Sequence, residues 1–328
     1  MLLGRRRRSG YTIPVAAGVV GSAAAIGTAV ALADRVVRRM TAPSRVRRPL
    51  QMGFTPFETG VDYMDVTFPG GHDTPLRGWL LSRHASAPAI LACGGYRAPR
   101  SDLLGISSNL WRAGYNVLLF DYAGYGDEPG PVTLGYRELA DARAALRFLQ
   151  QRCPGAPLGM IGFSMGAAIA IMVGAREPQV RAVLADSPFT DQREILRFHI
   201  ARDFRLPPSG VTDLLARLLL ALVDRRLFRL FGYRLSDVNP LVDVTRIAPR
   251  PLMLIHGEAD RTIPLEHTRR MERAARAAGV LVEAHYVPAA GHCDAYFLDR
   301  AGYCARARAF FASHLGMPVS APASGVSR

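Results

Sequence analysis

The sequence predicts an α/β protein with a mostly parallel sheet of eight strands flanked by helices. Six short apolar runs have the length and composition of strands buried on both faces of a parallel sheet. They are AILAC (89–93), YNVLLF (115–120), PLGMIGF (157–163), VRAVLA (180–185), PLMLIH (251–256) and VEAHYV (282–287). Helical patterns stand between them, at residues 136–151, 164–177, 265–278 and 300–315. This alternation is typical of doubly wound α/β domains.

The predicted α/β domain covers residues 61–315. Two earlier runs, YMDVTF (63–68) and LRGWLL (76–81), predict an antiparallel pair that opens the sheet. At about residues 191–248 the alternation stops, and a helical, apolar pattern without a strand predicts a helical cap inserted in the domain. Charged residues interrupt that pattern too often for a membrane span. Residues 316–328 form a low-complexity tail that we expect to be disordered.

The amino-terminal segment predicts a membrane anchor. Residues 1–10 are basic, and residues 11–33 carry no charge over a length of about 35 Å, enough to cross a bilayer. A cleaved signal peptide is the alternative, because ALA before Asp34 resembles a cleavage site. The arginines that follow at once retard translocation and favour an uncleaved anchor. We therefore expect a single-pass membrane protein whose residues 34–60 form a basic linker.

The distribution of charge bears on topology and on partners. The chain has a net charge of +14, and ten of its 41 basic residues fall within residues 1–48. Four arginines precede the apolar run and six follow it, so the positive-inside rule places the catalytic domain on the cytoplasmic side. No nucleic-acid-binding module accompanies the basic residues, and we expect no nucleic-acid partner.

The stretch GFSMG (162–166) predicts a nucleophilic serine. Ser164 follows a strand-like run and opens a helical pattern rich in small residues. In a nucleophile elbow, Gly162 and Gly166 leave room for the strained turn that exposes the serine hydroxyl. A serine hydroxyl is a poor nucleophile at neutral pH, so it needs a base within reach and an acid that orients the base.

Asp260 and His292 are the predicted acid and base. Asp260 lies just after the run PLMLIH, and His292 lies in the loop PAAGHCDAY after the next strand. Catalytic groups in open α/β sheets collect at these carboxyl ends of strands, and the order Ser, Asp, His is the one this architecture uses. Asp186, which also ends a strand, is the alternative acid. Glu258 sits tighter against its strand, and His256 and His285 fall inside apolar runs where core histidines are expected.

Two backbone amides are the predicted oxyanion donors. One is the N–H of Met165, immediately after the nucleophile. The other is the N–H of Tyr96 in the loop CGGYRAPR, which follows the third strand. The four cysteines show no C-x-x-C pair, and the sequence leaves a bridge between Cys293 and Cys304 open.

Together these segments resemble the α/β-hydrolase fold, and in particular the single-domain serine hydrolases grouped with serine aminopeptidases and prolyl-oligopeptidase-like esterases. The matching pieces are LACGGYRAPRSD, LLFDYAGYGDEPG, MIGFSMGAA, ADSPFTD, IHGEADRTIP and PAAGHCDAY. The resemblance implies that Ser164, Asp260 and His292 form a catalytic triad. The family often has His where Gly94 stands, which leaves the shape of the oxyanion loop less defined.

The expected activity is cleavage of a carboxylic ester or thioester through an acyl-enzyme, with no metal or organic cofactor. The expected substrate is a small-molecule or lipid-like ester. The predicted anchor, its flanking arginines and the apolar cap favour a hydrophobic acyl ester met at the bilayer.

Two other functions stay open, together with the oligomeric state. A serine aminopeptidase needs an acidic group for the substrate amine, and Asp203, Asp213 and Asp224 are candidates. The second open function is that of a membrane-tethered binding protein, which has the hydrolase fold but catalyses no reaction. A metal site at His292, Cys293 and Asp294 is disfavoured, because adjacent residues rarely converge on one ion.

Overall fold

The computed structural model describes residues 12–43, 54–126, 130–203 and 209–316. The predicted basic terminus 1–10, most of the predicted tail and part of the predicted linker lie outside these residues. The described chain forms two compact units. The larger unit holds the whole sheet, and the smaller unit holds α6 and α1 as far as Arg39.

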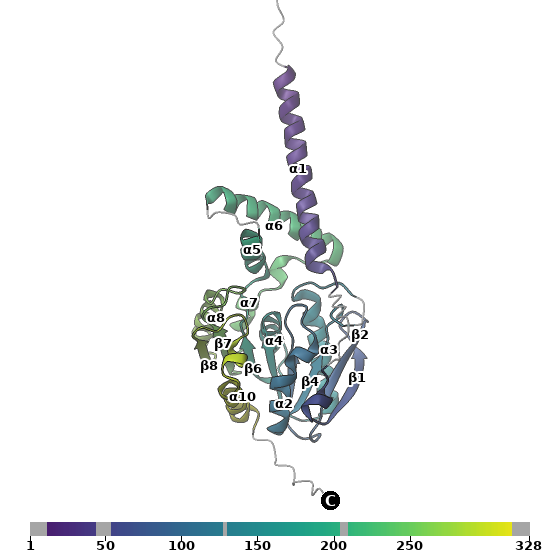
Figure 1. Cartoon of the computed structure of the whole chain (residues 1–328), viewed down its shortest axis with the longest axis vertical. Helices are drawn as coiled ribbons and strands as arrows, with labels where there is room; N and C mark the ends of the chain where they lie inside the picture. Colours follow the sequence, from purple (N-terminus) through teal and green to yellow (C-terminus); the bar gives the residue numbers. More distant parts are fainter. Residues whose placement is uncertain (1–11, 44–53, 127–129, 204–208, 317–328) are drawn as a thin grey trace, which may run out of the picture. The chain divides into compact units, whose positions relative to one another are not determined.

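The larger unit contains the predicted sheet of eight strands (Figure 1). The strands are β1 (Tyr63–Pro69), β2 (Pro75–Leu81), β3 (Ala89–Cys93), β4 (Asn116–Phe120), β5 (Leu158–Phe163), β6 (Val180–Asp186), β7 (Leu252–Gly257) and β8 (Val282–Val287). Their order is β1-β2-β4-β3-β5-β6-β7-β8, in which the pairs β1–β2 and β2–β4 are antiparallel and all the other pairs are parallel. The predicted fold class is therefore confirmed.

Ten helices and three 3-10 turns lie in the described residues, and those of the larger unit cover both faces of its sheet. The helices are α1 (Thr12–Thr41), α2 (Leu104–Arg112), α3 (Tyr136–Arg152), α4 (Met165–Arg176), α5 (Gln192–Asp203), α6 (Gly210–Phe231), α7 (Pro240–Val244), α8 (Glu266–Ala277), α9 (Ala295–Leu298) and α10 (Arg300–Leu315), with 3-10 turns η1 (Pro56–Thr59), η2 (Arg100–Leu103) and η3 (Leu235–Asp237). Helices α2 and α10 contact each other on one face, whereas α3, α4, α7 and α8 form a continuous layer on the other.

The core follows from this layering. The central strands β3 and β4 are buried along their whole length, as their unbroken apolar runs predict. On the face of α2 and α10 the core is rich in large side chains, including Trp111, Tyr115, Phe310 and Phe311. Helix α4 is buried on all sides by contacts with β5, β6 and α7. This burial holds the end of β5 and the start of α4 in a fixed geometry.

The segment between β6 and β7 contains helices α5, α6 and α7 and, among its described residues, no strand. Helix α6 begins at a capping box, in which the Ser209 side chain accepts from the backbone N–H of Thr212 at 3.3 Å, and it ends at Gly232 in the left-handed conformation. Within the smaller unit, Arg226 of α6 pairs with Asp34 of α1 at 2.9 Å.

The predicted membrane anchor is wrong. In the parts of the chain that the structure describes, no helix is long and apolar enough to cross a bilayer. The physical reason is that alanine and glycine dominate residues 12–33 and contribute little transfer free energy. The helix also continues through Asp34, Arg35, Arg38 and Arg39, where the linker was predicted. The prediction of a single-pass membrane location, with a cytoplasmic catalytic domain, is overturned with it.

The cysteine residues are all free thiols, including Cys293 and Cys304. Burial raises the pKa of Cys93 to about 12, so this thiol stays protonated inside the sheet. The structure therefore contains no bridge between the pair that the sequence left open.

Candidate active site

Ser164 lies on a sharp turn between β5 and α4. Its backbone has φ 55° and ψ −118°, a combination that strains a residue with a side chain. The turn is possible because its neighbours are glycines: a Cβ on Gly166 would overlap the carbonyl oxygen of Cys93, and a Cβ on Gly162 would overlap that of Gly166. The Ser164 N–H donates to the Asp186 carbonyl at 2.8 Å, which ties the turn to β6.

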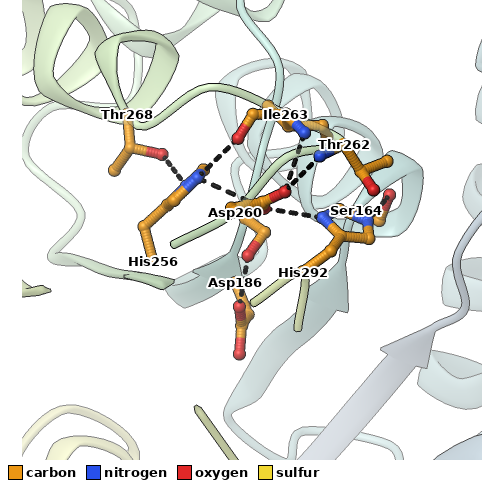
Figure 2. A network of polar contacts seen from close by, with 9 residues as sticks. Ser164, Asp186, His256, Asp260, Thr262, Ile263, Thr268 and His292 are labelled. Carbon is orange, nitrogen blue, oxygen red and sulfur yellow. Dashed lines mark hydrogen bonds and ion pairs between the residues drawn. The ribbon is translucent and has the colours of Figure 1, made fainter. Parts of the chain in front are cut away.

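The structure brings Ser164, His292 and Asp260 together in one hydrogen-bonded chain (Figure 2). Nε2 of His292 lies 2.9 Å from Oγ of Ser164, and Nδ1 lies 2.7 Å from Oδ2 of Asp260. An ionised carboxylate only accepts, so Nδ1 carries the proton and Nε2 is left to accept from the serine hydroxyl. This is the geometry of a serine activated by an oriented base.

The loops that carry Asp260 and His292 are joined by backbone hydrogen bonds. The N–H of Ala259 donates to the carbonyl of Ala290 at 2.9 Å, and the N–H of Glu258 donates to the carbonyl of Val287 at 3.0 Å. Both loops follow neighbouring parallel strands, so their residues meet at one edge of the sheet. The spacing between Asp260 and His292 is therefore set by main-chain contacts.

The Asp260 carboxylate has four close neighbours. Its Oδ1 accepts from the N–H groups of Thr262 at 2.7 Å and Ile263 at 2.9 Å. Its Oδ2 faces His292 and also lies 3.4 Å from Nε2 of His256. Although burial raises its pKa, the hydrogen bond and charge of His292 and the two backbone N–H groups hold the pKa of Asp260 below its usual value.

His256 is a fully buried histidine behind Asp260, as the sequence predicted for a core position. Its Nδ1 pairs with the hydroxyl of Thr268 at 2.7 Å, and its Nε2 donates to the carbonyl of Ile263 at 2.9 Å. Burial lowers its pKa, so the ring is neutral. The contact with Asp260 was missed, because position 256 in an apolar run indicates a core role and nothing about its neighbours.

Asp186, the alternative acid, lies beside the chain of Ser164, His292 and Asp260 but does not contact His292. Its carboxylate accepts from the hydroxyl of Ser187 at 2.9 Å and from that of Tyr303 at 3.0 Å, and it is fully buried. Burial raises the pKa of Asp186 to about 6, although the two hydroxyls oppose this shift.

This raised pKa predicts a stability that falls as pH rises. The unfolded carboxyl group loses its proton near its usual value of 3.8, whereas the folded group keeps it to about 6, so the folded state loses relative stability across this range. Asp186→Asn removes that loss. The free energy of unfolding of Asp186→Asn minus that of wild type is expected to increase by on the order of 2 kcal/mol from pH 4 to pH 7. Urea unfolding of both proteins across this range checks it; a difference independent of pH contradicts it.

The two segments predicted to donate to an oxyanion both lie at Ser164. Met165 opens α4, and the first N–H groups of a helix have no acceptor within the helix. In the loop after β3, a Cβ placed on Gly95 would lie 3.5 Å from that of Ser164. Tyr96 follows in this loop, and its hydroxyl donates to the carbonyl of Met40 at 2.6 Å. The roles of the Met165 and Tyr96 amides stay predictions.

The other predicted candidates have contacts of their own. Asp203, Asp213 and Asp224 each pair with an arginine, at 3.3 Å from Arg202, 3.5 Å from Arg217 and 2.8 Å from Arg234. Glu258 and His285 are not among the contacts of the Ser164 chain. Within residues 12–43, 54–126, 130–203 and 209–316, no cluster of three or more histidine, cysteine, aspartate or glutamate side chains is arranged to hold a metal ion.

One family model matches most of this chain. The model described as "Alpha/beta hydrolase family" matches residues 89–307. The uncharacterized protein Rv2307c of Mycobacterium tuberculosis is 33% identical over 229 residues, which make up 68% of this chain and 70% of that protein. The uncharacterized protein YqkD of Bacillus subtilis is 26% identical over 259 residues, 77% of this chain and 82% of that protein.

Solved structures show the same fold. The Pyrococcus furiosus esterase Pf2001 has a TM-score of 0.64 at 22% identity, covering 81% of this chain and 98% of its own. The acylaminoacyl peptidase of Pyrococcus horikoshii has a TM-score of 0.59 at 15% identity, covering 80% of this chain and 43% of its own. At these identities the likeness concerns the fold alone, which hosts esterases and peptidases alike.

Proposed function

This chain belongs to the alpha/beta hydrolase family, and we propose that it is a serine hydrolase that cleaves a carboxylic ester or thioester through an acyl-enzyme. The observation that carries the proposal is the hydrogen-bonded chain from Ser164 through His292 to Asp260, with contacts of 2.9 and 2.7 Å. The family often places such a chain at this edge of the sheet, but the assignment here rests on the geometry of these three residues.

In the proposed reaction, Oγ of Ser164 attacks the carbonyl carbon while Nε2 of His292 takes the hydroxyl proton. Asp260 stabilises the imidazolium through Nδ1–H. The N–H groups of Met165 and Tyr96 bind the oxyanion of the tetrahedral intermediate. The proton on Nε2 then passes to the leaving alcohol or thiol, and the acyl group stays on Ser164.

Deacylation repeats these steps with water. Nε2 of His292 takes a proton from the water that attacks the acyl-enzyme, and it returns that proton to Oγ of Ser164 as the carboxylic acid leaves. His292 suits this exchange because its side chain is about a quarter exposed, whereas that of Asp260 is fully buried. The base can thus reach water while the acid stays fixed.

An ester is favoured over a peptide with a free amine. An aminopeptidase needs a carboxylate to pair with the substrate ammonium group, and all three aspartates considered for that role already pair with arginine. With the predicted anchor overturned, the preference for an ester met at a bilayer loses its main argument. The proposal is therefore a small-molecule ester, with the acyl group unassigned.

Matched substrates test this preference. Amide cleavage requires protonation of a more basic leaving group, so p-nitrophenyl butyrate is expected to exceed butyryl p-nitroanilide in kcat/KM by at least about 100-fold. Leucyl p-nitroanilide is the control for amine recognition, and it should be no better a substrate than butyryl p-nitroanilide. Faster cleavage of the leucyl compound, or an ester rate equal to the amide rate, would favour the aminopeptidase instead.

A further inference from the structure

The buried hydroxyl of Tyr125 lies where three segments of the larger unit meet. It is 3.2 Å from Oε1 of Glu138 in α3 and 3.4 Å from Sδ of Met165 in α4. The backbone N–H of Arg97, in the loop after β3, faces this hydroxyl closely enough to lower the pKa of Tyr125. Tyr125 thus lies against Met165, which follows Ser164, and beside Arg97, which follows Tyr96.

The protons at this junction have one consistent arrangement. Tyr125 has a single hydroxyl proton, and the Glu138 carboxylate accepts only, so the tyrosine donates to Glu138. Burial and the charge of Glu138 raise the pKa of Tyr125 well above its usual value, while the backbone N–H of Arg97 opposes this shift. The hydroxyl therefore stays protonated, and it touches the Met165 sulfur by packing.

Glu138 is anchored independently of Tyr125. Its carboxylate accepts from the N–H of Thr133 at 2.8 Å, from the hydroxyl of Thr133 at 2.6 Å and from the N–H of Gly135 at 3.0 Å. It lies in the first turn of α3, where the helix dipole favours a negative charge. With 1% of its surface exposed, it is a fixed point for the tyrosine.

We propose that Tyr125, held by Glu138, is a positioning residue that sets the distance between the two backbone arms of the oxyanion site. This role rests on the proposed function. One arm is the start of α4 at Met165, and the other is the loop through Tyr96 and Arg97. Oxyanion donors must stand within about 0.5 Å of the productive geometry, and a contact that spans both arms controls that separation.

The test is Tyr125→Phe, which keeps the ring and removes only the hydroxyl. With p-nitrophenyl butyrate, kcat is expected to fall about 10- to 100-fold, the size of a small displacement of catalytic groups, while KM stays within about twofold. The affinity of a butyl boronic acid, which forms a tetrahedral adduct, should fall with kcat/KM. The pH profile should not move, because the triad is untouched.

Tyr122→Phe is the matched control. Tyr122 is an equally buried tyrosine that packs edge-on against Tyr125 at 5.3 Å, and among the described residues its hydroxyl has no hydrogen-bond partner. It should keep kcat within about twofold of wild type. Thermal melts of both variants report the folded fraction.

The outcomes separate this inference from the proposed function. A folded wild-type protein without ester turnover defeats the proposed function itself. The inference is overturned if the wild type is active and Tyr125→Phe has the same kcat as Tyr122→Phe. It is also overturned if Tyr125→Phe changes KM alone. If Tyr125→Phe does not fold, Thr133→Val, which removes one donor to Glu138, should lower kcat without changing KM; an unchanged kcat then overturns it.

Discussion

Replacing Ser164 with alanine is expected to lower kcat for p-nitrophenyl butyrate by about 10⁵-fold, close to the loss seen when a catalytic serine is removed from other triads. The reason is that, in the proposed mechanism, His292 and Asp260 activate the Ser164 hydroxyl, whose Oγ lies 2.9 Å from Nε2 of His292. The loss should appear in kcat and kcat/KM alike. Steady-state turnover of the purified full-length variant measures it.

Ser187→Ala is the matched control for Ser164→Ala. Ser187 is a neighbouring buried serine that shares the positive φ of Ser164, at 55°, but its hydroxyl donates to Asp186. Its removal costs one hydrogen bond and should leave kcat within about tenfold of wild type. Residual activity of Ser164→Ala comparable to that of Ser187→Ala would mean that another group is the nucleophile.

The second large effect is expected for Asp260→Asn, at about 10⁴-fold in kcat. An asparagine at this position either donates its amide N–H toward Nδ1 or accepts from it without a charge. The first option reverses the ring tautomer, so that Nε2 can no longer accept the proton of Ser164. The second leaves the imidazolium without a charged partner during the reaction.

Asp186→Asn separates the two acids that the sequence left open. Asp186 contacts Ser187 and Tyr303, whereas Oδ2 of Asp260 lies 2.7 Å from Nδ1 of His292. We therefore expect Asp186→Asn to retain kcat within about tenfold, a thousandfold better than Asp260→Asn. Similar losses of kcat in both variants, or a larger loss in Asp186→Asn, would favour Asp186 over Asp260 as the acid that orients His292.

Much of the fold and the three-residue chain is predictable because the signals are local. Each strand is an apolar run bounded by turn residues, and the structure has β3 and β7 within a residue of the predicted runs. Ser164 is marked by its glycines, which the turn requires because no Cβ fits there. Asp260 and His292 follow parallel strands, and parallel strands bring their carboxyl ends together.

The remaining parts depend on contacts that no local pattern encodes. Tyr125 and Glu138 meet Met165 and Arg97 only through the packing of α3 and α4 on the sheet. The geometry around His256 likewise needs the loop at Ile263. The membrane prediction failed for a different reason: an uncharged run of alanine and glycine satisfies a length rule but supplies little transfer free energy.

The most direct test of Ser164 as the nucleophile is the mass of the intact full-length chain after incubation with a fluorophosphonate, followed by peptide mapping. The proposed mechanism predicts a single phosphonyl adduct on the peptide that contains Ser164, slow to form in His292→Ala and absent from Ser164→Ala. A folded wild-type chain that remains unmodified, or an adduct that maps to another residue or survives Ser164→Ala, would contradict it.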